Sequence, residues 1–232
     1  MHIGLIGGIG IASTVVYYQR LTAAIEAAGG VLDLTIEHAN VHDLIRTNRD
    51  DKREEQAQYY AKHIDRLAAA GCDCVAITSL GGHFCFDKTV ALSSLPLVSA
   101  VAPLDTYFAE QGHKTVGLLG TRVVMKTGLY GQLTKTRAVE LADENDIIGQ
   151  TYVDMALAGR CTPEQRTFFL NAGKRLMETQ VADAIVLAGT DLNLAFDGQT
   201  TDYPVIDALN VHVDVLARLA TDQISLHDVG AE

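Results

Sequence analysis

The chain has 232 residues, of which 48% are hydrophobic and 20% are charged, and its formal net charge is −11 at pH 7. This length can bury one large core or two small ones, whereas the acidic balance argues against a nucleic-acid partner or an anionic membrane surface, both of which need a basic face. No apolar stretch approaches the ~20 residues that a membrane-spanning helix needs, and no signal peptide precedes the first predicted strand. We therefore expect a cytoplasmic protein, for which a small anionic substrate remains possible.

Short apolar runs alternate with longer amphipathic segments along the first half of the chain. The predicted strands cover residues 2–6, 32–38, 74–78 and 97–99. The predicted helices cover about 13–28, 51–70, the segment after 83, and 101–112. Between them lie turns rich in glycine and hydroxyl residues, which is typical of strands that lead into helices.

The same alternation restarts in the second half. Its predicted strands cover residues 115–119, 147–148, 184–187 and 205–206. Helices are expected at 128–134, 163–180 and 211–221, the second of them with Pro163 in its first turn, where a missing N–H costs little. Strands that alternate with helices predict parallel sheets with right-handed crossovers.

The two halves resemble each other in outline. Residues 115–121 repeat the pattern of residues 2–8, and residues 184–189 take the place that 74–79 hold in the first half. We predict an α/β fold of two pseudo-twofold-related halves, each with a mainly parallel sheet between helices, and an active-site cleft between the halves. The first half would span 1–100 with a closing helix at about 210–224, the second 101–209, and 225–232 would form a tail.

Ligands of such sheets bind outside the carboxyl ends of the strands, so the loop Gly7-Gly8-Ile9-Gly10 is the first candidate site. Its glycines could turn backbone N–H groups towards an anion, or could simply make a tight turn. The run Gly8-x-Gly10-x-x-Ser13 matches a dinucleotide fingerprint only approximately, and such a match alone is weak. We expect no nicotinamide and no other cofactor.

The cysteines and histidines do not indicate a metal site. Cys72-x-Cys74 has the wrong spacing for a thioredoxin motif and offers only half of a zinc site. His38 and His42, even taken with His83 and Cys85, match no strong zinc pattern. The thiol of Cys85 could have a lowered pKa near a helix start or could be packed in the core. The four cysteines, Cys72, Cys74, Cys85 and Cys161, are expected to be free thiols.

Three further glycine- and hydroxyl-rich segments follow predicted strands, at residues 78–83, 120–130 and 187–191. Their order and spacing, with Gly7-Gly8 near the start and Pro204-Val-Ile-Asp207 near the end, resemble the aspartate/glutamate racemase superfamily over nearly the whole chain. The resemblance implies a substrate held between two α/β halves, catalysis without a cofactor, and a homodimer.

In that family each half supplies one cysteine, so that one thiolate removes the α-proton and the other thiol returns a proton on the opposite face. Residue by residue, the first motif, Cys-Asn-Thr-x-His, falls on Ser79, Leu80, Gly81 and His83, and the second cysteine falls on Gly189. Both thiols are therefore absent. A serine hydroxyl is far less acidic than a thiol, whose pKa is about 8.5, so the two-thiol reaction is not expected.

The resemblance leaves three candidate catalytic residues, Ser79, His83 and Asp191. His83 could activate Ser79 or could only cap and pack, and Asp191 could be a base or could orient its neighbour. The candidate substrate-binding residues all lie at or beside strand ends: Gly8, Ile9, Asn40, Leu80, Gly81, Gly82, Thr121, Thr127, Gly189 and Thr190.

The function we expect is that of a cofactor-independent isomerase or racemase-like enzyme, acting on a small amino or dicarboxylic acid with a non-standard acid/base set. Two alternatives stay open: a lyase or decarboxylase acting on a related carboxylate, and a catalytically silent protein that binds small carboxylates. The expected partners are the carboxylate substrate and a second copy of the chain, with no nucleic acid and no membrane.

Overall fold

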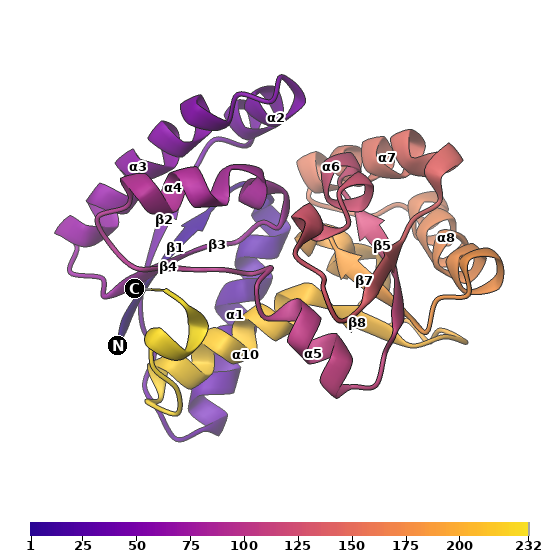
Figure 1. Ribbon diagram of the computed structural model, residues 1–232. Helices are drawn as coiled ribbons and strands as arrows, with labels where there is room; N and C mark the ends of the chain where they lie inside the picture. The colour runs from indigo at the N-terminus through magenta and orange to yellow at the C-terminus, as the bar shows by residue number, and fades with distance from the viewer. Residues whose placement is uncertain (232) are drawn as a thin grey trace. The chain divides into compact units, whose positions relative to one another are not determined.

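The computed structural model describes residues 1–231, which form two α/β units (Figure 1). Unit 1 contains Met1–Ala100 and the chain from Asn210 onward, and unit 2 contains Val101–Leu209. Each unit is built on a four-stranded sheet in which every pairing is parallel. The predicted α/β fold of two halves, each with a parallel sheet, is confirmed.

The sheet of unit 1 has the strand order β2-β1-β3-β4. Figure 1 shows α1 and α10 on one face of it and α3 and α4 on the other. The strands are β1 (His2–Gly7), β2 (Asp33–His38), β3 (Cys74–Ile77) and β4 (Leu97–Val98). The helices are α1 (Ile11–Ala27), α2 (Val41–Arg49), α3 (Arg53–Ala69), α4 (Phe86–Leu92) and α10 (Ala208–Ala220), with a 3₁₀ turn at Gly81–Cys85.

The sheet of unit 2 has the equivalent order β6-β5-β7-β8. Figure 1 shows α7 and α5 on opposite faces of it. The strands are β5 (Thr115–Gly120), β6 (Arg137–Val139), β7 (Ala184–Ala188) and β8 (Val205–Asp207). The helices are α5 (Leu104–Glu110), α6 (Arg122–Lys126), α7 (Asn145–Ala158), α8 (Pro163–Gln180) and α9 (Asn193–Phe196), with 3₁₀ turns at Leu129–Gly131, Ala142–Glu144 and Thr190–Leu192.

The strand register makes the two candidate proton-transfer positions equivalent. Gly4 of β1 pairs with Val75 of β3, and Gly117 of β5 pairs with Ile185 of β7. Ser79 and Gly189 follow Val75 and Ile185 at the same spacing along the chain, so each lies just beyond the third strand of its unit. By the same count, Gly8 and Thr121 are equivalent residues just beyond β1 and β5.

Several predicted elements are wrong. The predicted strand at 147–148 lies within α7, where Ile148 is buried and Ile147 is 57% exposed, so two adjacent apolar residues on a helix imitated a buried strand. Strand β6 and helix α2 were not predicted. The segment expected to form a helix at 128–134 contains only the 3₁₀ turn Leu129–Gly131, because residues 128–131 all have positive φ, which an α-helix does not allow. By contrast, α8 has the predicted bounds, and its start is fixed by a capping box between Thr162 and Gln165, with Pro163 as the first helical residue.

Helix α10 contacts α1 through a buried pair of polar side chains. The hydroxyl of Tyr17 on α1 lies 2.8 Å from Nδ1 of His212 on α10, and both side chains are fully buried. Beyond α10, the predicted tail contains a 3₁₀ turn at His227–Val229. In the described part of the chain, none of the helices has the length and apolarity required to cross a bilayer.

Candidate active site

The loop after β1 uses its polar groups within unit 1. Gly8 has φ +82°, and a Cβ there would lie 2.6 Å from the carbonyl oxygen of Ala39, so glycine is required. The Gly8 N–H donates to Oγ1 of Thr14 at 2.9 Å, and that oxygen lies 3.5 Å from Oγ1 of Thr78 beyond β3. The predicted anion cradle therefore has its Gly8 N–H already bonded to a side chain, while Ile9 is only 6% exposed.

Asn40, predicted to bind substrate, serves as a helix cap. Its Oδ1 accepts a hydrogen bond from the His42 N–H at 3.0 Å, which satisfies a donor at the start of α2. Its own N–H donates to the Tyr59 hydroxyl at 2.9 Å. These bonds give Asn40 a structural role at the start of α2 that does not involve a substrate.

The segment after β3 brings Ser79, Gly82 and His83 together in the core of unit 1. Ser79 is 7% exposed, and its Oγ accepts a hydrogen bond from the Gly82 N–H at 3.3 Å. Leu80, Gly81 and Gly82 are also buried. A Cβ at Gly82 would lie 2.6 Å from the Tyr60 hydroxyl, so this turn packs tightly beneath α3.

Both ring nitrogens of His83 bond to backbone groups. Nε2 accepts a hydrogen bond from the Ala100 N–H at 3.0 Å, which leaves the ring proton on Nδ1, where it is donated to the carbonyl oxygen of Ser79 at 2.8 Å. Burial lowers the pKa of His83 to about 4, so the ring is neutral near pH 7. His83 thus contacts the backbone of Ser79, and neither nitrogen is bonded to the Ser79 hydroxyl that it was expected to activate.

The thiols of unit 1 are not poised for proton transfer. Burial raises the pKa of Cys85 to about 11 and that of Cys74 to about 12, so both stay protonated near neutral pH. Cys85 is 2% exposed and contacts Thr89 on α4. Among residues 1–231, no group of three or more histidine, cysteine or acidic side chains is arranged to hold a metal ion.

The two threonines after β5 differ in what their hydroxyls contact. Oγ1 of Thr127 accepts from the Tyr130 N–H at 3.0 Å and donates to the Val123 carbonyl oxygen at 2.7 Å, so it closes a local turn. Oγ1 of Thr121 is buried and has no hydrogen-bond partner among the described residues. Thr121, whose unit 1 equivalent is Gly8, is therefore the better placed of the two to bind a ligand.

The segment after β7 carries a buried carboxylic acid beside a buried phenol. Asp191 is 2% exposed and Thr190 is 1% exposed. The hydroxyl of Tyr152 on α7 donates to Oδ2 of Asp191 at 3.3 Å and lies 3.5 Å from the Asp191 N–H. Burial, and then the charge of Asp191, raises the pKa of Tyr152 well above its ordinary value of 10.0, so the phenol keeps its proton.

Two residues of unit 2 were missed by the sequence analysis. Asn193 is 2% exposed, yet neither atom of its side-chain amide has a partner within residues 1–231; a polar residue within the apolar run 192–196 was its only signal. Tyr152 reaches Asp191 from a helix 39 residues earlier in the chain. Nothing in its local sequence indicates that contact.

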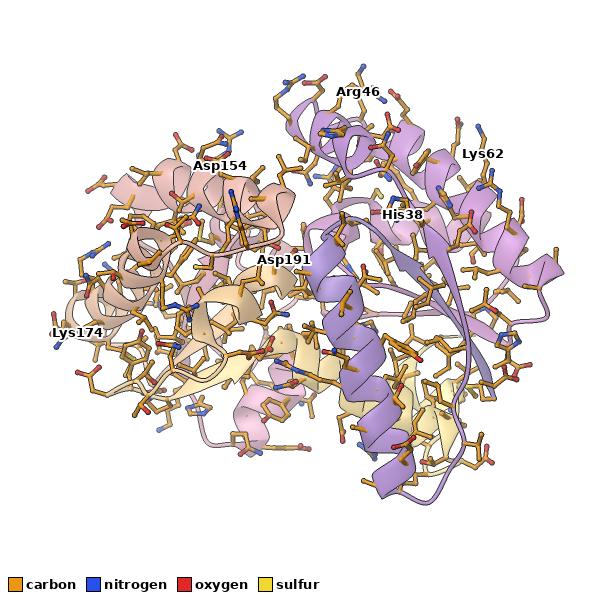
Figure 2. All side chains as sticks on the ribbon, turned by 180° about the vertical axis from the view of Figure 1, so that it is seen from behind. His38, Arg46, Lys62, Asp154, Lys174 and Asp191 are labelled. Atoms are coloured by element: carbon orange, nitrogen blue, oxygen red, sulfur yellow. The ribbon has the colours of Figure 1, made fainter. Side chains whose placement is uncertain are left out.

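Charged side chains lie on the outer sides of several helices, and some of them form ion pairs with one another. Figure 2 shows Arg46 and Lys62 on the outer sides of α2 and α3, and Asp154 on that of α7. Arg46 pairs with Glu55 at 2.7 Å, and Arg53 pairs with Asp51 at 2.8 Å. These exposed pairs contribute little to stability.

Comparison with known proteins identifies the family to which this sequence is similar. The family profile described as Asp/Glu/Hydantoin racemase matches residues 6–216. The broad specificity amino-acid racemase RacX of Bacillus subtilis is 22% identical to this chain over 212 residues, which cover 89% of this chain and 92% of that protein.

Solved structures share the fold. A candidate Asp/Glu racemase from Yersinia pestis has 24% sequence identity and a TM-score of 0.79, over 95% of this chain and 99% of that one. The aspartate racemase of Picrophilus torridus has 19% identity and a TM-score of 0.74, over 95% and 94% of the two chains. At these identities the likeness establishes the fold alone.

Proposed function

The chain belongs to the Asp/Glu/hydantoin racemase family, and from this premise we propose that it is an isomerase that acts on a small amino or dicarboxylic acid. The relative from Bacillus subtilis is an amino-acid racemase of broad specificity, which supports an amino acid as the substrate class. The acid/base set that we assign differs from a pair of thiols, because the family resemblance of the sequence aligns the two thiol positions with Ser79 and Gly189.

The observation that carries the proposal is the buried carboxylic acid of Asp191 at the end of β7, bonded to a phenol that keeps its proton. Removal of a proton α to a carboxylate needs a positioned base, and position 189 has no side chain to supply one. Within unit 2, Asp191 lies two residues further along the same turn. We assign it as the base that accepts the α-proton. A solvent water then protonates the carbanion on its opposite face, and Asp191 passes its proton to the hydroxide so formed, which restores the carboxylate.

In unit 1 we assign the hydroxyl of Ser79 to hydrogen-bond the substrate. His83 supports it indirectly, since its Nδ1–H holds the Ser79 carbonyl while its Nε2 holds the Ala100 N–H. This makes His83 a positioning residue. A neutral imidazole suits that role, because protonation at Nε2 would break the bond from the Ala100 N–H.

Recognition of the substrate carboxylate is assigned to Thr121 and Thr190. Thr121 presents a buried hydroxyl without a hydrogen-bond partner in the described part of the chain, and Thr190 is a buried residue of the turn after β7. A hydroxyl that donates to a carboxylate contributes about 1.5–3 kcal/mol to binding. We therefore expect Thr190→Val to weaken the binding of malonate about tenfold to a hundredfold.

Solvent exchange at Cα tests the reaction class. The protein is incubated with single L- and D-amino acids in D₂O, and deuterium at Cα is followed by NMR together with the enantiomer ratio. An isomerase incorporates deuterium and forms both enantiomers, and Asp191→Asn should slow this at least a hundredfold. Asp154→Asn, which removes an exposed carboxylate on α7, is the matched control.

The other outcomes would overturn parts of the proposal. An unsaturated or decarboxylated product would identify a lyase or decarboxylase, and thermal stabilisation by malonate without exchange would identify a silent binding protein. Exchange that persists unchanged in Asp191→Asn would remove Asp191 as the base. The expectation that Ser79 and Gly189 face each other across a cleft stays a prediction.

Two further expectations remain proposals, namely catalysis without a cofactor and a homodimer. Exchange should survive extended dialysis against EDTA and treatment with hydroxylamine, which attacks carbonyl cofactors. Sedimentation equilibrium should give twice the chain mass of 24.9 kDa. Loss of exchange after either treatment, or a mass of one chain, would contradict the corresponding expectation.

A further inference from the structure

The space beside Gly189 is occupied by an aromatic ring. A Cβ placed on Gly189 would lie 2.4 Å from Cε2 of Tyr152, 2.7 Å from Cζ and 3.0 Å from Cδ2. Carbon atoms in contact normally lie ~3.5–4.0 Å apart. Tyr152 is 6% exposed and packed within unit 2, so its ring cannot move away cheaply. No side chain, and in particular no thiol, fits at position 189 while Tyr152 holds this place.

The same ring carries its hydroxyl to the neighbouring acid. The Tyr152 hydroxyl donates to Oδ2 of Asp191 at 3.3 Å, two residues beyond Gly189. The phenol keeps its proton, so it donates a hydrogen bond to a carboxylate but cannot itself accept a proton. A donor to the ionised form of a carboxylic acid favours that form and so lowers its pKa.

We propose that Tyr152 takes over the volume of the missing second thiol, with its ring filling the space beside Gly189 and its hydroxyl positioning Asp191. Tyr152 is thus a positioning residue, and Gly189 is glycine because the ring requires it. The packing of the Tyr152 ring against Gly189 does not depend on the proposed function, whereas its effect on catalysis rests on the proposed role of Asp191 as base.

A double-mutant cycle tests the shared volume. In the unaltered protein, Gly189→Cys should lower the melting temperature by at least about 5 °C, because the ring and the new side chain overlap. Once Tyr152→Ala has removed the ring, the same Gly189→Cys change should cost little or should stabilise, so the two changes are strongly non-additive.

Gly173 supplies the matched control. A Cβ there would lie 2.5 Å from the hydroxyl of a different tyrosine, Tyr203, also in unit 2. Gly173→Ala should therefore destabilise equally with or without Tyr152→Ala. An additive result for Gly189→Cys with Tyr152→Ala, or a Gly189→Cys protein as stable as the unaltered one, would refute the proposal.

The volume-conserving variant Tyr152→Phe tests the hydroxyl, and it avoids the cavity that Tyr152→Ala creates. With ¹³C-labelled aspartate, the carboxyl carbon of Asp191 should titrate at a higher pH in Tyr152→Phe than in the unaltered protein, because a donor to its ionised form is lost. The carboxyl carbon of exposed Asp154, on the same helix as Tyr152, supplies the reference signal for this comparison. An unchanged Asp191 titration would refute the positioning role.

The pH profile of Cα exchange then separates this inference from the proposed function. If Asp191 is the base, the acidic limb of kcat should move with its titration in Tyr152→Phe. A shifted titration with an unmoved profile would leave the positioning contact intact and would overturn the assignment of Asp191 as base.

Discussion

The imidazole of His83 joins two segments of unit 1 by accepting the Ala100 N–H at Nε2, 3.0 Å away, while its other nitrogen binds the turn after β3. A second buried histidine, His212, lies close enough for its pKa to be affected by His83. Burial lowers the pKa of His83 to about 4 and that of His212 to about 3. Both rings are therefore neutral in the folded protein near pH 7.

These two histidines predict a loss of stability on acidification. The unfolded chain binds protons at these histidines near pH 6.5, whereas the folded protein binds them only near pH 3–4. The free energy of unfolding should thus be fully retained above pH 6.5 and should fall as the pH decreases from there, by up to roughly 1.4 kcal/mol per pH unit for each histidine. Urea denaturation between pH 7.5 and pH 4 measures this slope. It should be smaller in His212→Gln, and an equal slope in that variant would contradict the prediction.

Removal of the Thr121 hydroxyl should weaken ligand binding without lowering the stability of the protein. Thr121→Val removes a buried hydroxyl that has no hydrogen-bond partner among residues 1–231, so we expect a melting temperature no lower than that of the unaltered protein and a tenfold to hundredfold loss of malonate affinity. Thr127→Val is the control, because the Thr127 hydroxyl makes two local bonds and its loss should lower stability while affinity is kept. Calorimetric titration and thermal unfolding give both quantities. Equal affinities in the unaltered protein and Thr121→Val would contradict this.

The unpaired amide of Asn193 should cost stability. Asn193→Leu keeps the branch at Cγ and removes two buried polar atoms that lack partners within residues 1–231, so we expect the free energy of unfolding to rise by about 1–3 kcal/mol. Asn145→Leu is the control, since Nδ2 of Asn145 bonds to Glu140 and its loss should destabilise the protein. Urea denaturation compares the three proteins. A drop in stability for Asn193→Leu would show that this amide makes a stabilising contact.

A side chain at Gly8, in the loop after β1, should destabilise the protein for two separate reasons: its positive φ and its steric overlap with neighbouring atoms. Gly8 and Gly29 both have positive φ, +82° and +76°, but a Cβ at Gly29 would meet nothing within 4 Å, whereas one at Gly8 would meet Ala39 and His38. Gly29→Ala should cost about 1–2 kcal/mol, the penalty of the left-handed backbone alone. Gly8→Ala should cost clearly more. Equal losses in chemical denaturation would mean that the loop relaxes around the added methyl group.

Much of the fold could be predicted from local sequence because its causes act over a few residues. The start of α8 follows from Thr162 and Gln165, which cap each other within a single turn, and from Pro163 in the first helical turn. Apolar runs located β1, β5 and β7 because a strand buried on both faces needs no other pattern. Where apolar residues were few, as in Arg137–Val139, the same reasoning missed the strand.

The residue types at the strand ends were also determined by the sequence: Ser79, Thr190 and Asp191 stand there, and Gly189 has no side chain. What these groups contact was decided by tertiary structure. Nε2 of His83 meets the Ala100 N–H across 17 residues, and Tyr152 meets Asp191 across 39. Such contacts depend on strand order and on how helices pack over a sheet, which no local periodicity specifies. Only the folded chain, therefore, bonds His83 to the backbone and places the ring of Tyr152 beside Gly189.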